Sequence, residues 1–331
     1  MQRRDDIDLT KGFAILLVVF GHLVARADPA HVQWYEPLRR AVYAFHMPLF
    51  LYLSGLVAVL SGTILAPRTA WPKVVKARAK RLLAPFFLIG GLVVLGKIIA
   101  ARVMFVDNVP AGFWDGLSGL LWHTARSPAL SVWYLFVLFV VSLGAMVLLA
   151  GKPARLPWLL AGAMILYLLP LPAYVYLDRV GTYAVFFGLG AWAGVLGARW
   201  DDFIDRSWPW LLALLLCGLA LVAFFGANWP EKLTLLPLGA LSMPAIHGWL
   251  RFWAASSHRV LLFLGRYSFM IYLFNTLFIG LTKGVLLLFC SWDGPNFLPF
   301  AAALMSAGIL GPVTLKRAVF RRVRVLDRLT D

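Results

Sequence analysis

Two ionisable side chains with helical spacing stand out in the apolar N-terminal segment of this sequence. Lys11 and His22 are eleven residues apart. Eleven residues make about three helical turns, so both side chains project from one face of a helix, roughly 16 Å apart along its axis. Asp8 lies one turn before Lys11, where it can form an ion pair with it. Such a row can hold an anion at its basic end and transfer a proton at the other, because imidazole titrates near neutral pH.

A second histidine opens the next apolar segment, in the stretch Tyr43-Ala-Phe-His-Met-Pro-Leu-Phe. We interpret both apolar segments as membrane spans. The chain then crosses the membrane in the first segment and returns in the second, so we expect His22 and His46 at similar depth. Two imidazoles at one cavity would suit proton transfer, although His46 could equally cap or pack a helix end. For His22 the sequence favours a functional role, because an ionisable group deep in an apolar helix is costly.

Basic residues without an acidic neighbour form a third candidate site. The residues from 68 to 81 include Arg68, Lys73, Lys76, Arg78, Lys80 and Arg81. One interpretation is that they mark the cytoplasmic side of a membrane and attract anionic lipid. The other is that they hold the phosphates of a nucleotide-like molecule, for which arginine and lysine are suitable donors. The sequence leaves both interpretations open.

The elements that must position these residues are membrane spans. The chain has 331 residues, of which 61% are hydrophobic and 14% are charged, whereas about 25% of the residues of soluble domains are charged. Apolar runs of about twenty residues, long enough to cross a bilayer, recur along the whole chain. They predict an all-α, polytopic integral membrane protein with a single domain over residues 1–331. About ten transmembrane helices are predicted, at 7–25, 41–63, 82–106, 130–150, 157–177, 180–198, 208–227, 233–250, 260–283 and 297–315.

The distribution of charge gives these spans an orientation. About 22 of the 31 lysine and arginine residues fall on one side of the predicted spans, and such an excess marks the cytoplasmic side. With an even number of spans, both termini lie on that side. The net charge of +16 therefore follows from membrane topology, so we expect membrane lipids and not nucleic acid as partners.

Other residues that could do chemistry lack the context for it. Cys217 and Cys290 lie far apart in apolar segments without metal or redox spacing, so we expect both to be buried apolar side chains and expect no metal. Ser54 has no G-x-S-x-G context and is interpreted as a small residue at a helix–helix contact.

Several of these stretches together resemble the membrane acyltransferase-3 family. In Asp8-Leu-Thr-Lys11-Gly-Phe-Ala-Ile-Leu-Leu-Val-Val-Phe-Gly-His22, a basic residue, ten residues and a histidine match the hallmark of that family. Phe45-His-Met-Pro-Leu-Phe-Leu-Tyr-Leu-Ser-Gly55 resembles its second signature. Weaker similarities follow in the family's order over nearly the whole chain: Arg81-Leu-Leu-Ala-Pro-Phe, Trp133-Tyr-Leu and Leu264-Gly-Arg-Tyr-Ser-Phe-Met-Ile-Tyr-Leu-Phe-Asn275.

The resemblance implies an enzyme of the bacterial inner membrane with ten spans and both ends in the cytoplasm. Such an O-acyltransferase moves an acyl group, usually acetyl, from acetyl-CoA or another acyl-CoA to a hydroxyl group of a polysaccharide, lipid-linked glycan or glycolipid. His22 would then be the catalytic histidine, and Lys11, paired with Asp8, would occupy the family's basic position, which is commonly arginine.

On this hypothesis the phosphates of CoA bind Lys11 together with Arg78, Lys80 and Arg81, and the pantetheine arm reaches toward His22. The histidine would act as a general base on the acceptor hydroxyl, or it would carry the acyl group itself.

The acceptor would meet the site from the outer side of the membrane, where His46, Tyr43 and Arg40 would orient it. Asn275 occupies a position where many members of the family have histidine, which leaves the role of the ninth predicted span open.

Two other classes of protein could carry the same polar residues. A transporter or flippase would move a polar solute or glycolipid past them without consuming acyl-CoA. A structural membrane subunit would tolerate replacement of Lys11 and His22.

Overall fold

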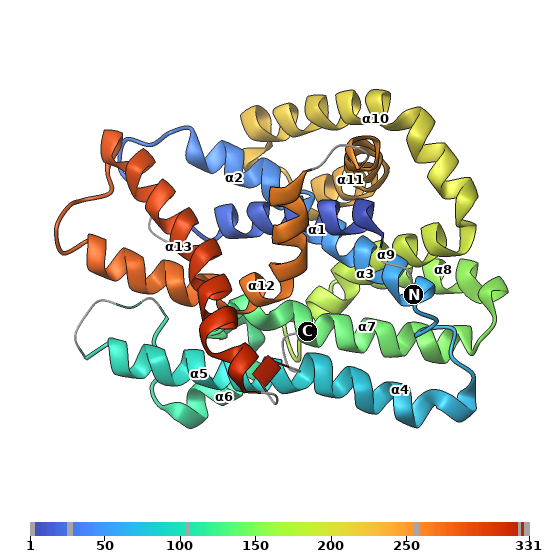
Figure 1. Ribbon diagram of the computed structural model, residues 1–331, viewed down its shortest axis with the longest axis horizontal. Helices are drawn as coiled ribbons and strands as arrows, with labels where there is room; N and C mark the ends of the chain where they lie inside the picture. The colour runs from blue at the N-terminus through green and yellow to red at the C-terminus, as the bar shows by residue number, and fades with distance from the viewer. Residues whose placement is uncertain are drawn as a thin grey trace.

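The computed structural model describes residues 4–24, 29–102, 106, 108–254, 258–323 and 326–327, and this part of the chain is helical without any strand. The helices are α1 Asp5–Gly21, α2 Tyr35–Tyr43, α3 His46–Leu60, α4 Trp71–Arg78, α5 Ala84–Ala100, α6 Phe113–Leu121, α7 Trp133–Leu149, α8 Leu156–Leu168, α9 Leu177–Leu196, α10 Ala198–Phe225, α11 Glu231–Trp253, α12 Arg259–Leu286 and α13 Phe297–Ala318. In Figure 1, α10 arches over one side of the molecule, α4 and α5 lie along the opposite side, and α1 and α3 lie between them.

Seven helical stretches among the described residues are long and apolar enough to cross a membrane. They are Tyr35–Leu60, Arg68–Ala100, Leu177–Leu196, Ala198–Asn228, Glu231–Trp253, Arg259–Leu286 and Gly294–Arg322, and α7 with α8 makes an eighth candidate if this pair, bent by 112°, counts as one span. The predicted all-α membrane class is therefore confirmed. The count is lower than the predicted ten because α1, α7 and α8, each predicted as a span, have 17, 17 and 13 residues.

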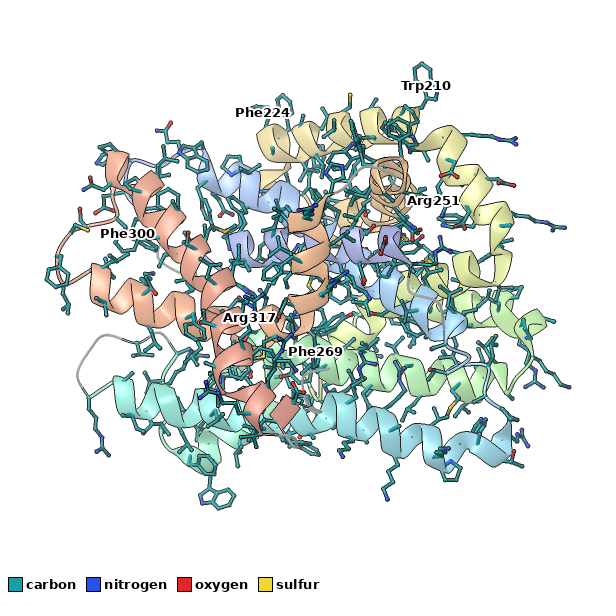
Figure 2. All side chains as sticks on the ribbon, viewed as in Figure 1. Trp210, Phe224, Arg251, Phe269, Phe300 and Arg317 are labelled. Atoms are coloured by element: carbon teal, nitrogen blue, oxygen red, sulfur yellow. The ribbon has the colours of Figure 1, made fainter. Side chains whose placement is uncertain are left out.

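Some elements differ from those that the sequence predicted. The helix α6 lies between two predicted spans, and α10 begins at Ala198, ten residues before the predicted span at 208–227. The helix α10 is curved in Figure 1 and contains Pro209. A proline inside a helix favours bending, because its ring removes a backbone hydrogen bond and crowds the preceding turn. Figure 2 shows Trp210 and Phe224 projecting outward from α10, and both are exposed.

The prediction that both cysteines are buried is wrong. Cys217 on α10 and Cys290, which follows α12, are both exposed. An apolar segment in a membrane protein can place side chains toward lipid as well as toward the protein interior, so apolarity alone does not indicate which face a residue occupies.

Glycines allow two pairs of helices to touch through their backbones. A Cβ atom on Gly12 of α1 would lie 2.1 Å from the carbonyl oxygen of Leu261 on α12, and a Cβ on Gly265 would lie 2.0 Å from the carbonyl oxygen of Asp8. The pair α3 and α9 meets in the same way at Gly55 and Gly190. Small residues permit this close approach in membrane proteins, where packing drives helix association.

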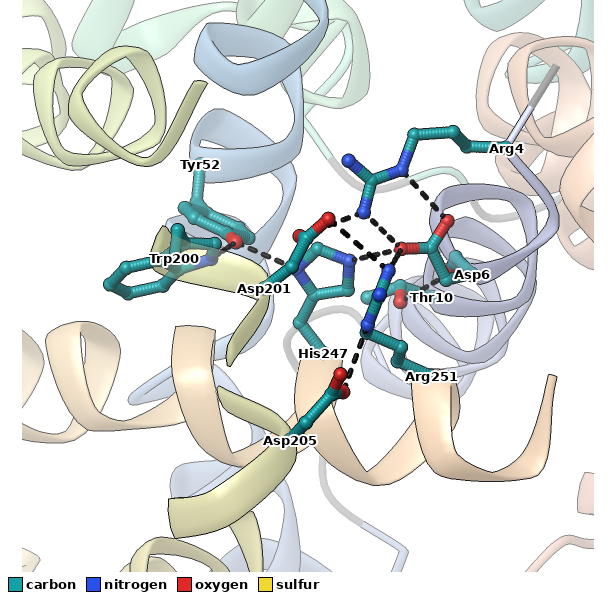
Figure 3. A network of polar contacts seen from close by, with 9 residues as sticks. All are labelled: Arg4, Asp6, Thr10, Tyr52, Trp200, Asp201, Asp205, His247 and Arg251. Carbon is teal, nitrogen blue, oxygen red and sulfur yellow. Dashed lines mark hydrogen bonds and ion pairs between the residues drawn. The ribbon is translucent and has the colours of Figure 1, made fainter. Parts of the chain in front are cut away.

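The start of α1 is held by a buried ionic cluster around Asp6 (Figure 3). The Oδ2 atom of Asp6 lies 2.6 Å from Nη2 of Arg4, 3.2 Å from Nε2 of His247 and 3.2 Å from Nη1 of Arg251. Arg4 also contacts Asp201 of α10, 2.9 Å away. These contacts connect α1 to α10 and α11.

The cluster continues through His247 into a fourth helix, α3. The hydroxyl of Tyr52, on α3, lies 2.7 Å from Nδ1 of His247 and accepts a hydrogen bond from Nε1 of Trp200 at 2.9 Å. His247 is fully buried, and its two ring nitrogens are both engaged. The cluster therefore fixes α1 relative to α3, α10 and α11.

Charge partners stabilise the ionised form of Asp6. Burial by itself would raise the pKa of the Asp6 carboxyl, but hydrogen bonds from His247 and Arg4 outweigh burial and lower this pKa well below its ordinary value. A lowered pKa means that the ionised carboxylate stabilises the folded protein.

We expect Gly265→Ala to destabilise the protein, because the added methyl group would overlap the backbone of α1. The matched control is Gly280→Ala on the same helix, where a Cβ meets nothing within 4 Å; it should be neutral or stabilise by about 0.5–1 kcal/mol, the helix propensity difference between the residues. Thermal unfolding in detergent measures both. Equal melting temperatures for the two variants would contradict the close approach.

We expect Asp6→Asn to lower the free energy of unfolding at pH 7 by roughly 2–3 kcal/mol, because Arg4 and Arg251 lose a buried carboxylate and keep only the more exposed Asp201 in common. The wild type should also lose stability as the pH falls below about 4, the ordinary carboxyl pKa, toward the lower pKa in the folded state, and Asp6→Asn should lose less over that range. Asp5→Asn, which removes an exposed neighbouring carboxylate, is the control. Parallel pH–stability curves for the wild type and Asp6→Asn would contradict this expectation.

Candidate active site

His22 follows directly after the last residue of α1 and meets α12 there. Its Nδ1 atom lies 2.7 Å from Oδ1 of Asn275. The amide nitrogen of Asn275 in turn donates to the carbonyl oxygens of Ile271 and Tyr272, each at 2.9 Å. Asn275 is fully buried, whereas His22 is only partly so.

Lys11 and Asp8 form the ion pair that their spacing predicts, with 3.6 Å between Nζ and Oδ1. The Lys11 side chain is 30% exposed and that of Asp8 is 9% exposed. The helix α1 is unbroken from Asp5 to Gly21 and carries Lys11, as the sequence predicts, but it ends one residue before His22, which the sequence placed within the same helix.

Residues predicted to hold the acceptor lie beside His22 with one exception. The Tyr43 hydroxyl donates to the Gly21 carbonyl at 3.0 Å, and the ring of Tyr43 contacts that of His46 with 4.9 Å between centroids. His46 is buried, and through Tyr43 it is one contact away from Gly21, the residue before His22. Arg40 instead points to α10, where Nη1 lies 3.4 Å from the Ala223 carbonyl.

Nδ1 of His46 is hydrogen-bonded to the backbone at the end of α2. It lies 2.9 Å from the carbonyl oxygen of Val42, and a carbonyl oxygen only accepts, so this nitrogen carries a proton. The contact is the capping arrangement that the sequence left open as one role for His46.

A π-helical turn at Ala79–Leu83 joins α4 to α5 and carries Lys80 and Arg81. Single π-turns within α-helices are rare and occur often at functional sites. Arg78 precedes the turn and donates from Nε to the Ser142 hydroxyl of α7 at 2.8 Å. Lys80 and Arg81 are exposed, whereas Arg78 is partly buried. Within the described ranges, neither arginine forms an ion pair with a carboxylate.

Tyr134 connects this basic pair to the centre of the molecule. Arg78 binds Ser142 of α7, and Tyr134 lies on the same helix about two turns earlier. The Tyr134 hydroxyl lies 2.6 Å from Oγ of Ser54, on α3. Ser54 is therefore more than the packing residue that the sequence predicted, because it also forms a polar contact between α3 and α7.

Tyr272 completes the connection to the histidine. Its ring lies 5.4 Å from that of Tyr134, and its hydroxyl donates to the backbone carbonyl of Ser131. Asn275 lies one helical turn further along α12. Shared helices and a ring contact thus link the basic turn, through Tyr134 and Tyr272, to Asn275 and His22.

Two cavities lie elsewhere in the molecule. One of about 560 Å³ is lined by Arg4, Asp5, Asp6, Asp205, Arg251, Phe252 and Ala254. The other, of about 430 Å³, lies between α8, α9 and α11 and is almost entirely apolar. No group of His, Cys, Asp and Glu side chains that could hold a metal ion occurs among the described residues.

Sequence reasoning missed His247 of the Asp6 cluster and two tyrosines of the candidate site. His247 could have been recognised as a candidate from the sequence, because it is an ionisable residue within a predicted span. Tyr134 and Tyr272 lie in stretches quoted for the family resemblance, but tyrosine in an apolar span is not distinctive. The partnership of Asn275 with His22 joins residues 253 positions apart, and no local pattern predicts it.

Comparison with known proteins identifies relatives of the chain. A model of the acyltransferase domain of the acyltransferase-3 family matches residues 4–317. The nodulation protein NolL of Sinorhizobium fredii is 33% identical over 189 residues, which cover 55% of this chain and 46% of that protein. NolL of Mesorhizobium japonicum is 26% identical over 230 residues, which cover 66% of this chain and 55% of that protein.

The chain thus spans about half the length of the curated relatives that it matches. No solved structure matches it significantly.

Proposed function

Because the chain belongs to the acyltransferase-3 family, we propose that it is an O-acyltransferase that moves an acyl group from cytoplasmic acyl-CoA to a hydroxyl group of a glycan or glycolipid. The observation that carries this proposal is the set of neighbouring side chains, through Tyr134 and Tyr272, that links a basic turn to a histidine. The basic end suits a donor with phosphates, and the histidine suits the transfer step.

We place this domain, over residues 1–331, in the bacterial inner membrane with ten spans and both termini in the cytoplasm. Two groups of helix ends support this arrangement. Arg4, Asp201 and Arg251, predicted on the cytoplasmic side, contact one another. On the predicted outer side, the backbone nitrogen of Ala30 donates to Asp293, at 2.8 Å. In this arrangement α1, α7 and α8 count as spans.

Arg78 and Arg81 are the proposed site for the phosphates of CoA. Two guanidinium groups without a carboxylate partner repel each other at close range, and a bound phosphate would relieve that repulsion through charge-assisted hydrogen bonds. Lys80 extends the basic surface, and Lys11 adds a further cation on α1. The pantetheine arm then follows Tyr134 and Tyr272 toward His22.

His22 is the proposed general base. As the acceptor oxygen attacks the thioester carbonyl, the imidazole takes the proton of the hydroxyl. The tetrahedral intermediate then expels the CoA thiolate, which recovers that proton from the imidazolium. The products are the acyl ester and free CoA, and the histidine returns to its neutral form.

The acceptor would enter from the side of His46 and Tyr43, which lie next to His22. Tyr43 presents a ring beside His46, and aromatic rings provide apolar surfaces with a polar tip. Arg40 would contribute farther out, beside α10.

An acyl-histidine intermediate on His22 is an alternative route to the same product. Incubation with labelled acyl-CoA in the absence of acceptor distinguishes the routes, because only the covalent route leaves label on the protein. A transporter would move its solute without releasing CoA.

We expect His22→Ala to lower acyl transfer by roughly 10²–10⁴-fold, the usual contribution of general-base catalysis, at unchanged protein levels in the membrane. The measurement is CoA release by the purified protein with an acceptor glycan present. His123→Ala, at an exposed histidine, is the control. Full activity of His22→Ala would refute the proposed mechanism.

We expect Arg78→Ala and Arg81→Ala each to raise KM for acyl-CoA about tenfold to a hundredfold, because a hydrogen bond to a charged group contributes about 1.5–3 kcal/mol. Arg78→Lys should recover part of the loss, since it keeps the charge but not the planar fork. Lys152→Ala, at an exposed lysine on the same predicted side, is the control for total charge. Unchanged KM in both alanine variants would place the phosphates elsewhere.

A further inference from the structure

We propose that Asn275 is a positioning residue that fixes the tautomer and the ring orientation of His22. This inference rests on the proposed role of His22 as a general base. Its starting point is the 2.7 Å contact between Nδ1 of His22 and Oδ1 of Asn275. The sequence left position 275 without a role, and the contact supplies one.

The orientation of the Asn275 amide is determined by α12 itself. Its nitrogen donates to the carbonyl oxygens of Ile271 and Tyr272. A flipped amide would point its oxygen at two carbonyl oxygens, and three acceptors would then face one another without a proton. The amide oxygen must therefore face His22.

This orientation decides which nitrogen of His22 is available for catalysis. An amide oxygen only accepts hydrogen bonds, so Nδ1 of His22 must carry the proton. In the neutral ring Nε2 then holds the lone pair, which a general base needs. No described residue forms a hydrogen bond with Nε2, and the side chain is only partly buried.

Packing of the two helices makes the contact rigid. Gly12 and Gly265 bring the backbones of α1 and α12 together. His22 lies ten residues after Gly12, and Asn275 lies ten residues after Gly265. Ten residues advance about 15 Å along a helix, so the two parallel helices present the pair at matching height. The complete burial of Asn275 prevents competition from water.

The titratable side chains of α2 and α3 nearest to this end of α1 are Tyr35, which donates to the Phe20 carbonyl, Tyr43, which donates to the Gly21 carbonyl, and His46, whose ring contacts that of Tyr43. Among the described residues, none of the three forms a hydrogen bond with Asn275. A change at position 275 therefore acts on His22 through the amide contact, and a shift in the pH profile can be assigned to that contact.

The first test compares Asn275→Leu, which removes the acceptor and keeps the branching at Cγ, with Asn275→Asp, which keeps an acceptor and adds charge. We expect Asn275→Leu to lower kcat roughly 10²-fold, within the 10²–10⁴-fold contribution of a general base, with KM for acyl-CoA within about twofold of wild type. We expect Asn275→Asp to be more active than Asn275→Leu and to move the acid limb of the kcat/KM profile to higher pH, because a carboxylate favours the imidazolium. A purely structural role would not move that limb.

Thr276→Val is the matched control, because it removes a polar side chain from the same turn of α12. The Thr276 hydroxyl contacts Ser131 at 3.2 Å and not His22, so kcat should stay within about twofold of wild type. Wild-type kcat in Asn275→Leu, or an unmoved acid limb in Asn275→Asp, would overturn the proposal.

The second test measures the tautomer of His22 directly and does not depend on enzyme activity. The chain has 6 histidines, so the ¹⁵N-histidine signals of the labelled protein can be resolved, and the signal of His22 is the one absent from His22→Ala. We expect a protonated Nδ1 and a bare Nε2 in the wild type, and a mixture of tautomers in Asn275→Leu. A wild-type His22 with its proton on Nε2 would overturn the proposal.

The two proposals fail in distinguishable ways. If His22→Ala is inactive while Asn275→Leu is fully active, histidine catalysis stands and the positioning role falls. If His22→Ala is fully active, the function proposed for His22 falls, whatever tautomer the spectra show.

Discussion

The close approach of α1 and α12 is the constraint on which the candidate site depends. Each helix has a glycine where it meets the backbone of the other, and a side chain at either position would force the helices apart. The contact sets the register of two parallel helices, so it also determines which residues meet ten positions later. His22 and Asn275 are that later pair. The ionic cluster at Asp6 holds the other end of α1, which leaves the helix little freedom to slide or rotate.

The candidate site combines two electrostatic situations that differ in their need for a ligand. Around Asp6, arginine and carboxylate side chains satisfy one another, and the cluster needs no further partner. Around Arg78 and Arg81, the described residues offer hydroxyl groups but no carboxylate. The paired charges around Asp6 hold helices together. The like charges of Arg78 and Arg81 repel each other, and an anionic ligand would remove that repulsion. The basic pair and the Asp6 cluster therefore have different roles, although both contain arginine.

Several features of the site were predictable because they depend on spacing within one helix. The unbroken α1 that carries Lys11 and leads to His22, and the pairing of Lys11 with Asp8, follow from a period of 3.6 residues. The position of α3 followed from its apolar run, with His46 at its start. The contacts of Asn275 with His22 and of Ser54 with Tyr134 join distant parts of the chain, and periodicity carries no information about them. The exposure of Cys217 and Cys290 was missed because lipid-facing and buried positions have the same apolar composition.

The residue at position 275 must satisfy two demands, and these demands restrict its identity. It faces two carbonyl oxygens of its own helix, which require a donor, and it faces Nδ1 of a neutral His22, which requires an acceptor. Asparagine meets both without a net charge, which matters because an unpaired charge within a membrane is costly. A permanent carboxylate would orient the ring as well but would favour the imidazolium, which cannot accept a proton. A neutral histidine also has one donor and one acceptor, but its single N–H could reach only one of the two carbonyl oxygens. Asparagine has two amide hydrogens, so it donates to both carbonyl oxygens while its oxygen faces His22.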